Sequence, residues 1–263
     1  MKLLSYHYHL KIDLDKQVAA HRFTLRCIPR SDDRQRITQV ERYVFPADFL
    51  SESRDSWGNL LLYGSCRNPH SSFEANVCGQ AVVGLAEGVP SVHPLRDDLF
   101  RYPTALTAGD EKLSRFAASL KVNGSAVHQA EAVMEGVHRA LSYVPGSTTV
   151  ETTAVQALNR GCGVCQDYAH LMLAVLRCMG IPSRYVVGML MGEGKSHAWV
   201  EVLCDGIWLA FDPTNCHRVA DEHIKISHGR DYGDCAINRG LFSGLARQTT
   251  DISVIVSEIR DHA

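Results

Sequence analysis

The hydrophobic pattern of this chain changes its period once, and that change limits the folds open to it. Over the first ninety or so residues apolar and polar residues alternate, which is typical of strands with one buried face. Residues 55–59 (DSWGN) and clusters of Pro, Ser and Gly separate the runs and predict turns. The alternating runs cover residues 6–15, 21–29, 37–46, 59–65 and 72–84. This spacing predicts an N-terminal β-sandwich domain over residues 1–95.

The pattern becomes helical at Asp110, after a stretch that reads as a linker. Residues 85–110 hold three prolines and little periodicity, so they mark the expected boundary between two domains. Helices are then predicted from Asp110 onward, over Ser125–Ser142 and over Thr152–Leu158. A chain of 263 residues is long enough for two domains, and the second is expected over residues 96–263.

Residues 160–216 predict a helix followed by three strands. The helix is expected from Cys165 to Met179, because apolar residues recur along one of its faces, with Gly180 and Pro182 ending it. Strands are expected at 184–191, 197–204 and 207–212, and Asp205-Gly206 is a strong signal for a hairpin between the last two. A final β run at 252–259 could belong to either domain. The sequence therefore predicts an α+β fold.

Charge and cysteine content exclude several classes of function. The chain has 27 Lys and Arg against 29 Asp and Glu, a net charge of −2, which gives no reason to expect nucleic acid or an anionic membrane as a partner. The first fifteen residues carry charges and histidines where a signal peptide needs an apolar stretch, so a cytoplasmic protein is expected. Nine cysteines, an odd number, predict reduced thiols rather than a disulfide framework.

The predicted hairpin brings together two residues with catalytic chemistry. His197 and Asp212 fall on one face, on a diagonal that side chains can bridge, while the opposite face is apolar. A carboxylate there would accept the imidazole N–H and fix its tautomer. Cys165 begins the predicted helix, where unpaired N–H groups favour a thiolate and stabilise an oxyanion. These residues predict a Cys–His–Asp triad, and a buried cysteine with a capping aspartate is the alternative.

Several motifs, in this order along the chain, resemble the transglutaminase-like superfamily of papain-type enzymes, specifically its bacterial cysteine-protease-like branch. They are WGN (57–59), GVCQDYAH (163–170), RCMGIPSRYV (177–186), SHAWVEV (196–202), WLAFDPTN (208–215), GRDY (229–232) and RGLFSG (239–244). The resemblance implies an N-terminal β domain and a papain-like core, in which a helix bearing the cysteine packs on an antiparallel sheet. It implies Cys165 as nucleophile, His197 as general base and then acid, and Asp212 as the orienting group.

This chemistry predicts attack of Cys165 on a peptide or glutamine-type amide to give a thioester. Water would resolve the thioester in a protease, and an amine would resolve it in a transglutaminase. The triad residues are the same for both acceptors and do not indicate which one is used. Peptide hydrolysis is the first expectation. A peptide or protein substrate is therefore expected, with no cofactor and no metal, and the sequence does not indicate an oligomeric state. A non-catalytic peptide-binding scaffold is a further hypothesis.

Other polar and aromatic residues have two interpretations each. Cys162 and Cys165 form a C-x-x-C pair, which could be a redox dithiol, a regulatory disulfide or half of a zinc site. Trp199 and Trp208 share the face of the triad and either shape the cleft or pack beneath it. Asp167 is expected to interact with the helix dipole. Structural roles are also expected for His170 and for the segment Arg230-Asp231-Tyr232.

Overall fold

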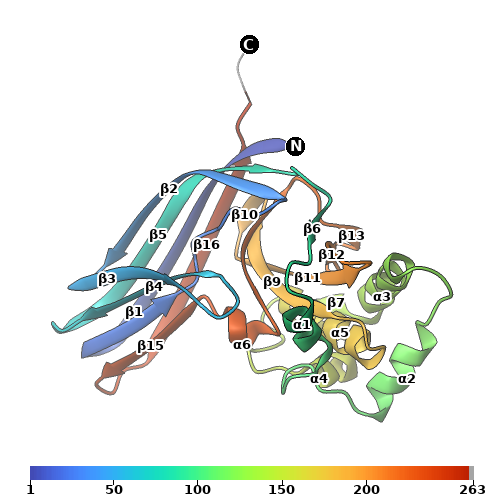
Figure 1. Cartoon of the computed structure of the whole chain (residues 1–263). Helices are drawn as coiled ribbons and strands as arrows, with labels where there is room; N and C mark the ends of the chain where they lie inside the picture. Colours follow the sequence, from blue (N-terminus) through green and yellow to red (C-terminus); the bar gives the residue numbers. More distant parts are fainter. Residues whose placement is uncertain (261–263) are drawn as a thin grey trace.

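The computed structural model describes residues 1–260 and contains two large antiparallel sheets, with the long helices packed around the second (Figure 1). The first sheet is formed by β1 (Lys2–Leu25), β2 (Gln35–Phe45), β3 (Phe49–Arg54), β4 (Leu60–Cys66), β5 (His70–Val83), β10 (Gly192–Gly194), β15 (Asn238–Ser243) and β16 (Gln248–Glu258). The second sheet is formed by β6 (Gly88–Pro90), β9 (Ser183–Leu190), β11 (His197–Cys204), β12 (Ile207–Asp212), β13 (His217–Arg218) and β14 (His223–Gly229). β7 (Ser142–Tyr143) and β8 (Cys162–Gly163) form a short parallel pair. This mixed architecture confirms the predicted fold class.

Strand β1 runs through the whole first sheet. Its first half pairs with β5 and β16, and its second half pairs with β4 and β15. Pairing shifts register between Asp13 and Val18 and again between Ala19 and Arg22, and Ala20 has a φ of +50°. The strand therefore changes its pairing partners at this point, from β5 and β16 to β4 and β15. The alternating runs at 6–15 and 21–29 are thus mostly parts of one strand rather than two separate ones.

The chain crosses between the two sheets more than once. β15 and β16, near the C-terminus, lie beside β1, so the final β run joins the first sheet. β6 lies before residue 95 but pairs with β12 of the second sheet. Each sheet thus takes strands from both sides of the boundary expected near residue 95. Alternating strand patterns look alike in sequence, and long-range pairing decides which sheet each strand joins.

The helices are α1 (Pro94–Asp97), α2 (Glu111–Ser119), α3 (Ala126–Ala140), α4 (Ala154–Arg160), α5 (Cys165–Cys178) and α6 (Tyr232–Cys235), with the 3₁₀ helix η1 (Asp98–Arg101). α5 packs on β9 and β11, and α2, α3 and α4 contact it from other sides. It is consequently buried on every face from Asp167 to Arg177, where the sequence indicated a single apolar stripe. Within the described residues, no helix is long and apolar enough to cross a membrane.

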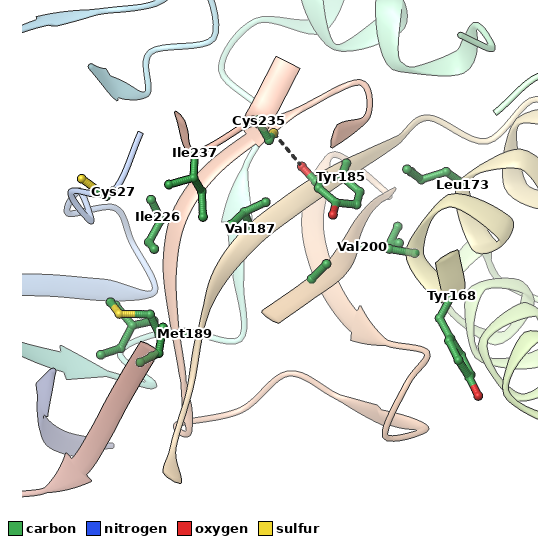
Figure 2. Close-up of a cluster of buried hydrophobic side chains, with 14 of the residues drawn as sticks. Cys27, Tyr168, Leu173, Tyr185, Val187, Met189, Val200, Ile226, Cys235 and Ile237 are labelled. Atoms are coloured by element: carbon green, nitrogen blue, oxygen red, sulfur yellow. Dashed lines mark hydrogen bonds between the residues drawn. The ribbon is translucent and has the colours of Figure 1, made fainter. Parts of the chain in front are cut away.

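One hydrophobic core joins the two sheets (Figure 2). In the close-up, Val187 of β9 lies between Ile226 of β14 and the α5 side chains Leu173 and Tyr168, and all four are buried. Two buried amide side chains add polar links between the sheets. Gln35 accepts the backbone N–H of Lys225 on β14 and donates to its carbonyl, both at 2.7 Å. Asn59 makes the same pair of bonds with the backbone of His228, at 2.8 and 2.9 Å.

Candidate active site

Cys165 is the first residue of α5, as the sequence predicted, and its side chain is half-buried. The carboxylate of Asp167 accepts the N–H of Val164 at 2.7 Å and the hydroxyl of Thr148 at 2.6 Å. These bonds fix the start of the helix against the preceding loop. A Cβ at Gly163 would stand 2.5 Å from that of Asp167, so only glycine fits there. Because the first N–H groups of a helix have no partner within it, they can hold an oxyanion beside the thiol.

His197 and Asp212 meet across the hairpin. β11 and β12 are joined at Asp205-Gly206, and both turn residues have positive φ, +48° and +83°, as this hairpin type requires. His197 Nε2 lies 2.7 Å from Asp212 Oδ2, and the imidazole is also close enough to the side chain of Cys165 to interact with it. The structure therefore brings the three residues of the predicted triad together. Whether they catalyse a reaction stays a prediction.

The electrostatics of the pair favour a charged imidazole. Burial alone would lower the pKa of His197, but the hydrogen bond to Asp212, and next the interaction with Cys165, outweigh it and raise this pKa to about 10. Burial alone would raise the pKa of Asp212, yet the hydrogen bonds from His197 and His223 hold it far below its ordinary value. At neutral pH the site therefore contains an imidazolium between the carboxylate of Asp212 and the sulfur of Cys165.

A second histidine completes the surroundings of Asp212. His223 Nε2, from the start of β14, lies 3.3 Å from the same Oδ2 that accepts His197. Asn215 also donates its side-chain amide to Oδ2, at 2.8 Å, and the backbone N–H of Thr214 donates to Oδ1 at 2.9 Å. The sequence did not indicate this role for His223, because its position beside Asp212 depends on the intervening loop.

The same three side chains are the group best placed to hold a metal ion. The donor atoms of His197, Asp212 and His223 lie within 4.8 Å of one another, and in residues 1–260 no other such group of histidine, cysteine and acidic side chains occurs. Direct hydrogen bonds account for the contacts of both histidines with Asp212. Cys162 lies on β8, pairs with Ser142 and is outside this group. All nine cysteines are free thiols.

The two tryptophans pack beneath the site rather than lining an open cleft. Trp199 and Trp208 are both about 1% exposed. The ring of Trp199 lies 6.2 Å from that of His197, and the indole N–H of Trp208 donates to Asp97 at 3.3 Å. Next to them, buried Glu201 pairs with Arg184 and Lys225, each at 2.6 Å. This buried layer supports the hairpin from the side opposite α5.

The remaining polar residues have structural contacts. His170 is fully buried, and burial lowers its pKa to about 4, so it is neutral while its Nε2 accepts the N–H of Tyr232. Arg230 forms an ion pair with Asp234 at 2.9 Å, and Asp231 is buried beside it. The first turn of α5 holds Asp167, as expected, but its hydrogen bonds with Thr148 and Val164 give it a more specific function than a dipole contact.

Comparison with known proteins shows which family the chain resembles. Residues 114–213 match the model of the transglutaminase-like superfamily, and residues 4–82 match that of the bacterial transglutaminase-like N-terminal region. An uncharacterised protein of Mycobacterium leprae is 34% identical over 257 residues, covering 89% of this chain and 90% of the relative. A protein-glutamine gamma-glutamyltransferase of Pseudomonas aeruginosa is 38% identical over 76 residues, which are 24% of this chain and 11% of that protein.

A solved structure shows that the fold is shared. The crystal structure of a candidate cysteine protease from Cytophaga hutchinsonii aligns with a TM-score of 0.81 at 20% identity, over 100% of this chain and 92% of that one. Its likeness extends over both sheets, so the N-terminal β unit and the helical core occur there in the same arrangement. Family models thus match both parts of the chain, a relative matches nearly its whole length, and the chain belongs to the transglutaminase-like superfamily.

Proposed function

We propose that this protein transfers acyl groups from amides of peptides or proteins through a thioester on Cys165, with water as the usual acceptor. The observation that carries the proposal is the position of His197, which is hydrogen-bonded to Asp212 and lies close enough to Cys165 for the two groups to interact. This chemistry requires a nucleophile, a base within hydrogen-bond reach of it and a group that orients the base.

In the proposed reaction the Cys165 thiolate attacks the amide carbonyl and forms the carbon–sulfur bond. The oxyanion is stabilised by N–H groups at the start of α5. The imidazolium of His197 protonates the leaving amine as the carbon–nitrogen bond breaks, which leaves a thioester and a neutral imidazole. His197 then takes a proton from water as the water attacks the thioester. The carbon–sulfur bond breaks, the acid is released, and the Cys165 thiolate and the His197 imidazolium are restored.

Access to the thiol favours water as the acceptor. Cys165 is half-buried rather than enclosed, so solvent can reach an acyl group attached to it. An amine would have to compete with bulk water at such a site. The partial match to a protein-glutamine gamma-glutamyltransferase nevertheless supports cross-linking as the second candidate. Both candidates share the thioester and differ only in the second step.

The activated thiol is tested by iodoacetamide labelling, followed by mass spectrometry, across a pH series. Cys178 is the matched control, because it is exposed and lies at the opposite end of the same helix. Burial raises the pKa of the Cys178 thiol. At pH 6 we expect Cys165 to label at least about 10-fold faster than Cys178, since a thiolate is the reactive form. His197→Ala should remove that advantage. Equal rates at the two cysteines, or no effect of His197→Ala, would favour the non-catalytic scaffold.

The acceptor is tested with an unfolded protein substrate and with a blocked glutaminyl peptide. Hydroxylamine at increasing concentration traps a thioester as hydroxamate, and the ratio of hydroxamate to acid gives the preference for amine over water. We expect acid to predominate at low hydroxylamine, and Cys165→Ala to abolish both products. Predominant amine transfer at low amine concentration would identify cross-linking as the activity instead.

A further inference from the structure

The first sheet forms a cavity that is open to solvent, away from Cys165. It has a volume of about 970 Å³, within the usual range for small-molecule sites. It lies beside the part of β1 where the pairing shifts register, and residues of β1, β3, β4, β5, β15 and β16 line it. Its aromatic side chains are Phe23, Phe49, Tyr63, Phe73 and Phe242.

Two glycines help to keep the cavity open. A Cβ at Gly64 would stand 2.5 Å from the ring of Phe23, and a Cβ at Gly240 would stand 2.8 Å from His21 Nε2. Both glycines line the cavity. Larger residues at these positions would displace the aromatic wall. The lining combines these aromatic and aliphatic side chains with polar ones. The polar lining residues are His21, Arg22, Thr24, Ser65, Asn238, Arg239 and Gln248.

His21 is 96% buried, yet its Nε2 has no hydrogen-bond partner among the described residues. The hydrogen bonds of the neighbouring His70 show which nitrogen of His21 carries the proton. His70 Nδ1 lies 3.0 Å from the carbonyl oxygen of Asn68, which can only accept, so Nδ1 carries the proton. In neutral His70 the other nitrogen, Nε2, is then an acceptor, and His21 Nδ1, 3.1 Å away, must donate to it.

The remaining nitrogen of His21 is consequently a bare acceptor at the cavity wall. Burial lowers the pKa of His21 to about 4, so the ring is neutral at physiological pH and Nε2 holds a lone pair. A ligand that donates to this nitrogen from within the cavity gains a hydrogen bond with it. The surrounding rings, Phe23, Phe73 and Phe242, lie 5.5, 5.1 and 6.0 Å from the His21 ring.

We propose that this cavity binds a small aromatic molecule that carries one hydroxyl or N–H donor. The aromatic part packs among the phenylalanine rings, and the donor bonds His21 Nε2. This site is separate from the proposed reaction at Cys165 and does not depend on it.

The test uses equilibrium dialysis of the full chain at pH 7.5 with three probes of similar size. 2-Naphthol has the ring and the donor, 2-methoxynaphthalene has the ring and the oxygen without the donor, and naphthalene has the ring alone. We expect one saturable site, with 2-naphthol bound about 3- to 10-fold more tightly than either other probe, as one neutral hydrogen bond allows.

Two variants locate the donor's partner. His21→Phe fits the aromatic surroundings and should abolish the preference for 2-naphthol while naphthalene still binds. His7→Phe is the matched control, because His7 is exposed on the same strand, and should keep the preference. If His21→Phe fails to fold, the affinities of the unmodified protein for 2-naphthol and 2-methoxynaphthalene still show whether the hydrogen-bond donor of the ligand contributes to binding. The absence of saturable binding, equal affinity for those two probes, or a preference that persists in His21→Phe would overturn the proposal.

Discussion

At the scale of single residues, the orientation of Asp212 depends on His223. Asp212 is fully buried, and two imidazoles donate to the same carboxylate oxygen. Burial is the main cause that lowers the pKa of His223, although Asp212 opposes it, so this histidine is neutral. A carboxylate can only accept, so the proton of His223 lies on Nε2. His223 therefore keeps Asp212 ionised and directed at His197 without adding a charge.

Replacing His223 should separate this positioning from simple packing. His223→Gln keeps an N–H donor near the position of Nε2, and we expect kcat within about 3-fold of the unmodified protein. His223→Leu removes the donor, and kcat should fall roughly 10- to 100-fold with little change in KM, as for other residues that orient a reacting group. Steady-state kinetics measure kcat and KM of both variants, with the concentration of active enzyme taken from labelling of Cys165 in a separate sample. Equal activity in His223→Leu and His223→Gln would show that His223 only fills space.

The His197–Asp212 pair should also make stability depend on pH. The pKa of His197 is raised, so its contribution is full below the ordinary value of 6.5 and is lost as pH rises through about 10. The pKa of Asp212 is lowered, so its contribution is full above 3.8 and is lost as pH falls. The free energy of unfolding lost in Asp212→Asn should thus be largest between about pH 4 and 6.5. Urea unfolding from pH 4 to 10 measures it, and a loss that grows toward pH 10 would contradict this assignment.

At the scale of helices and strands, Asp167 sets the start of α5 and hence the position of the thiol. Asp167→Ala removes its bonds to Val164 and Thr148, and we expect kcat to fall by roughly 10-fold or more as Cys165 shifts relative to His197. Asp110→Ala is the matched control, because Asp110 caps α2 by accepting the N–H of Leu113 at 2.8 Å.

Both substitutions remove a bond at a helix start, and the cap of α2 should cost about 1 kcal/mol of stability. Only Asp167→Ala should reduce activity and slow the labelling of Cys165. Thermal unfolding measures the first effect, and kinetics with labelling measure the second. If Asp110→Ala lowered kcat as much as Asp167→Ala, the loss would reflect stability rather than the position of the helix.

Local chemistry explains which elements could be predicted from the sequence. The start of α5, the turn at Asp205-Gly206 and the end of the helix at Gly180 each depend on neighbouring residues, and the structure has all three as expected. The contact of His223 with Asp212 and the placement of β15 and β16 depend on residues far apart in the chain. Alternation predicts that such a run is a strand, but it carries no information about its partner. The bonds of Gln35 and Asn59 to β14 were missed for the same reason.

At the scale of the whole molecule, the two sheets are expected to unfold together. The buried core is continuous between them, and Gln35 and Asn59 hold the backbone of β14 from the side of the first sheet. β10, a short strand between β9 and β11, pairs with β16 of the first sheet. Damage in the first sheet should therefore reach the triad, although no residue of that sheet belongs to it.

Adjacent residues of β16 provide the test of this coupling. Val254 is 1% exposed and faces the core, while its neighbour Ile255 is 42% exposed on the other face. Val254→Asp buries a carboxylate and should cost about 3 kcal/mol or more, whereas Ile255→Asp should change stability by less than about 1 kcal/mol. With Trp57→Phe introduced into every protein compared, tryptophan fluorescence reports the second sheet through Trp199 and Trp208, and far-UV circular dichroism reports both sheets. In urea we expect Val254→Asp to shift both signals to the same lower midpoint. A fluorescence midpoint that stays at the value of the unmodified protein would instead mean that the sheets unfold as independent domains.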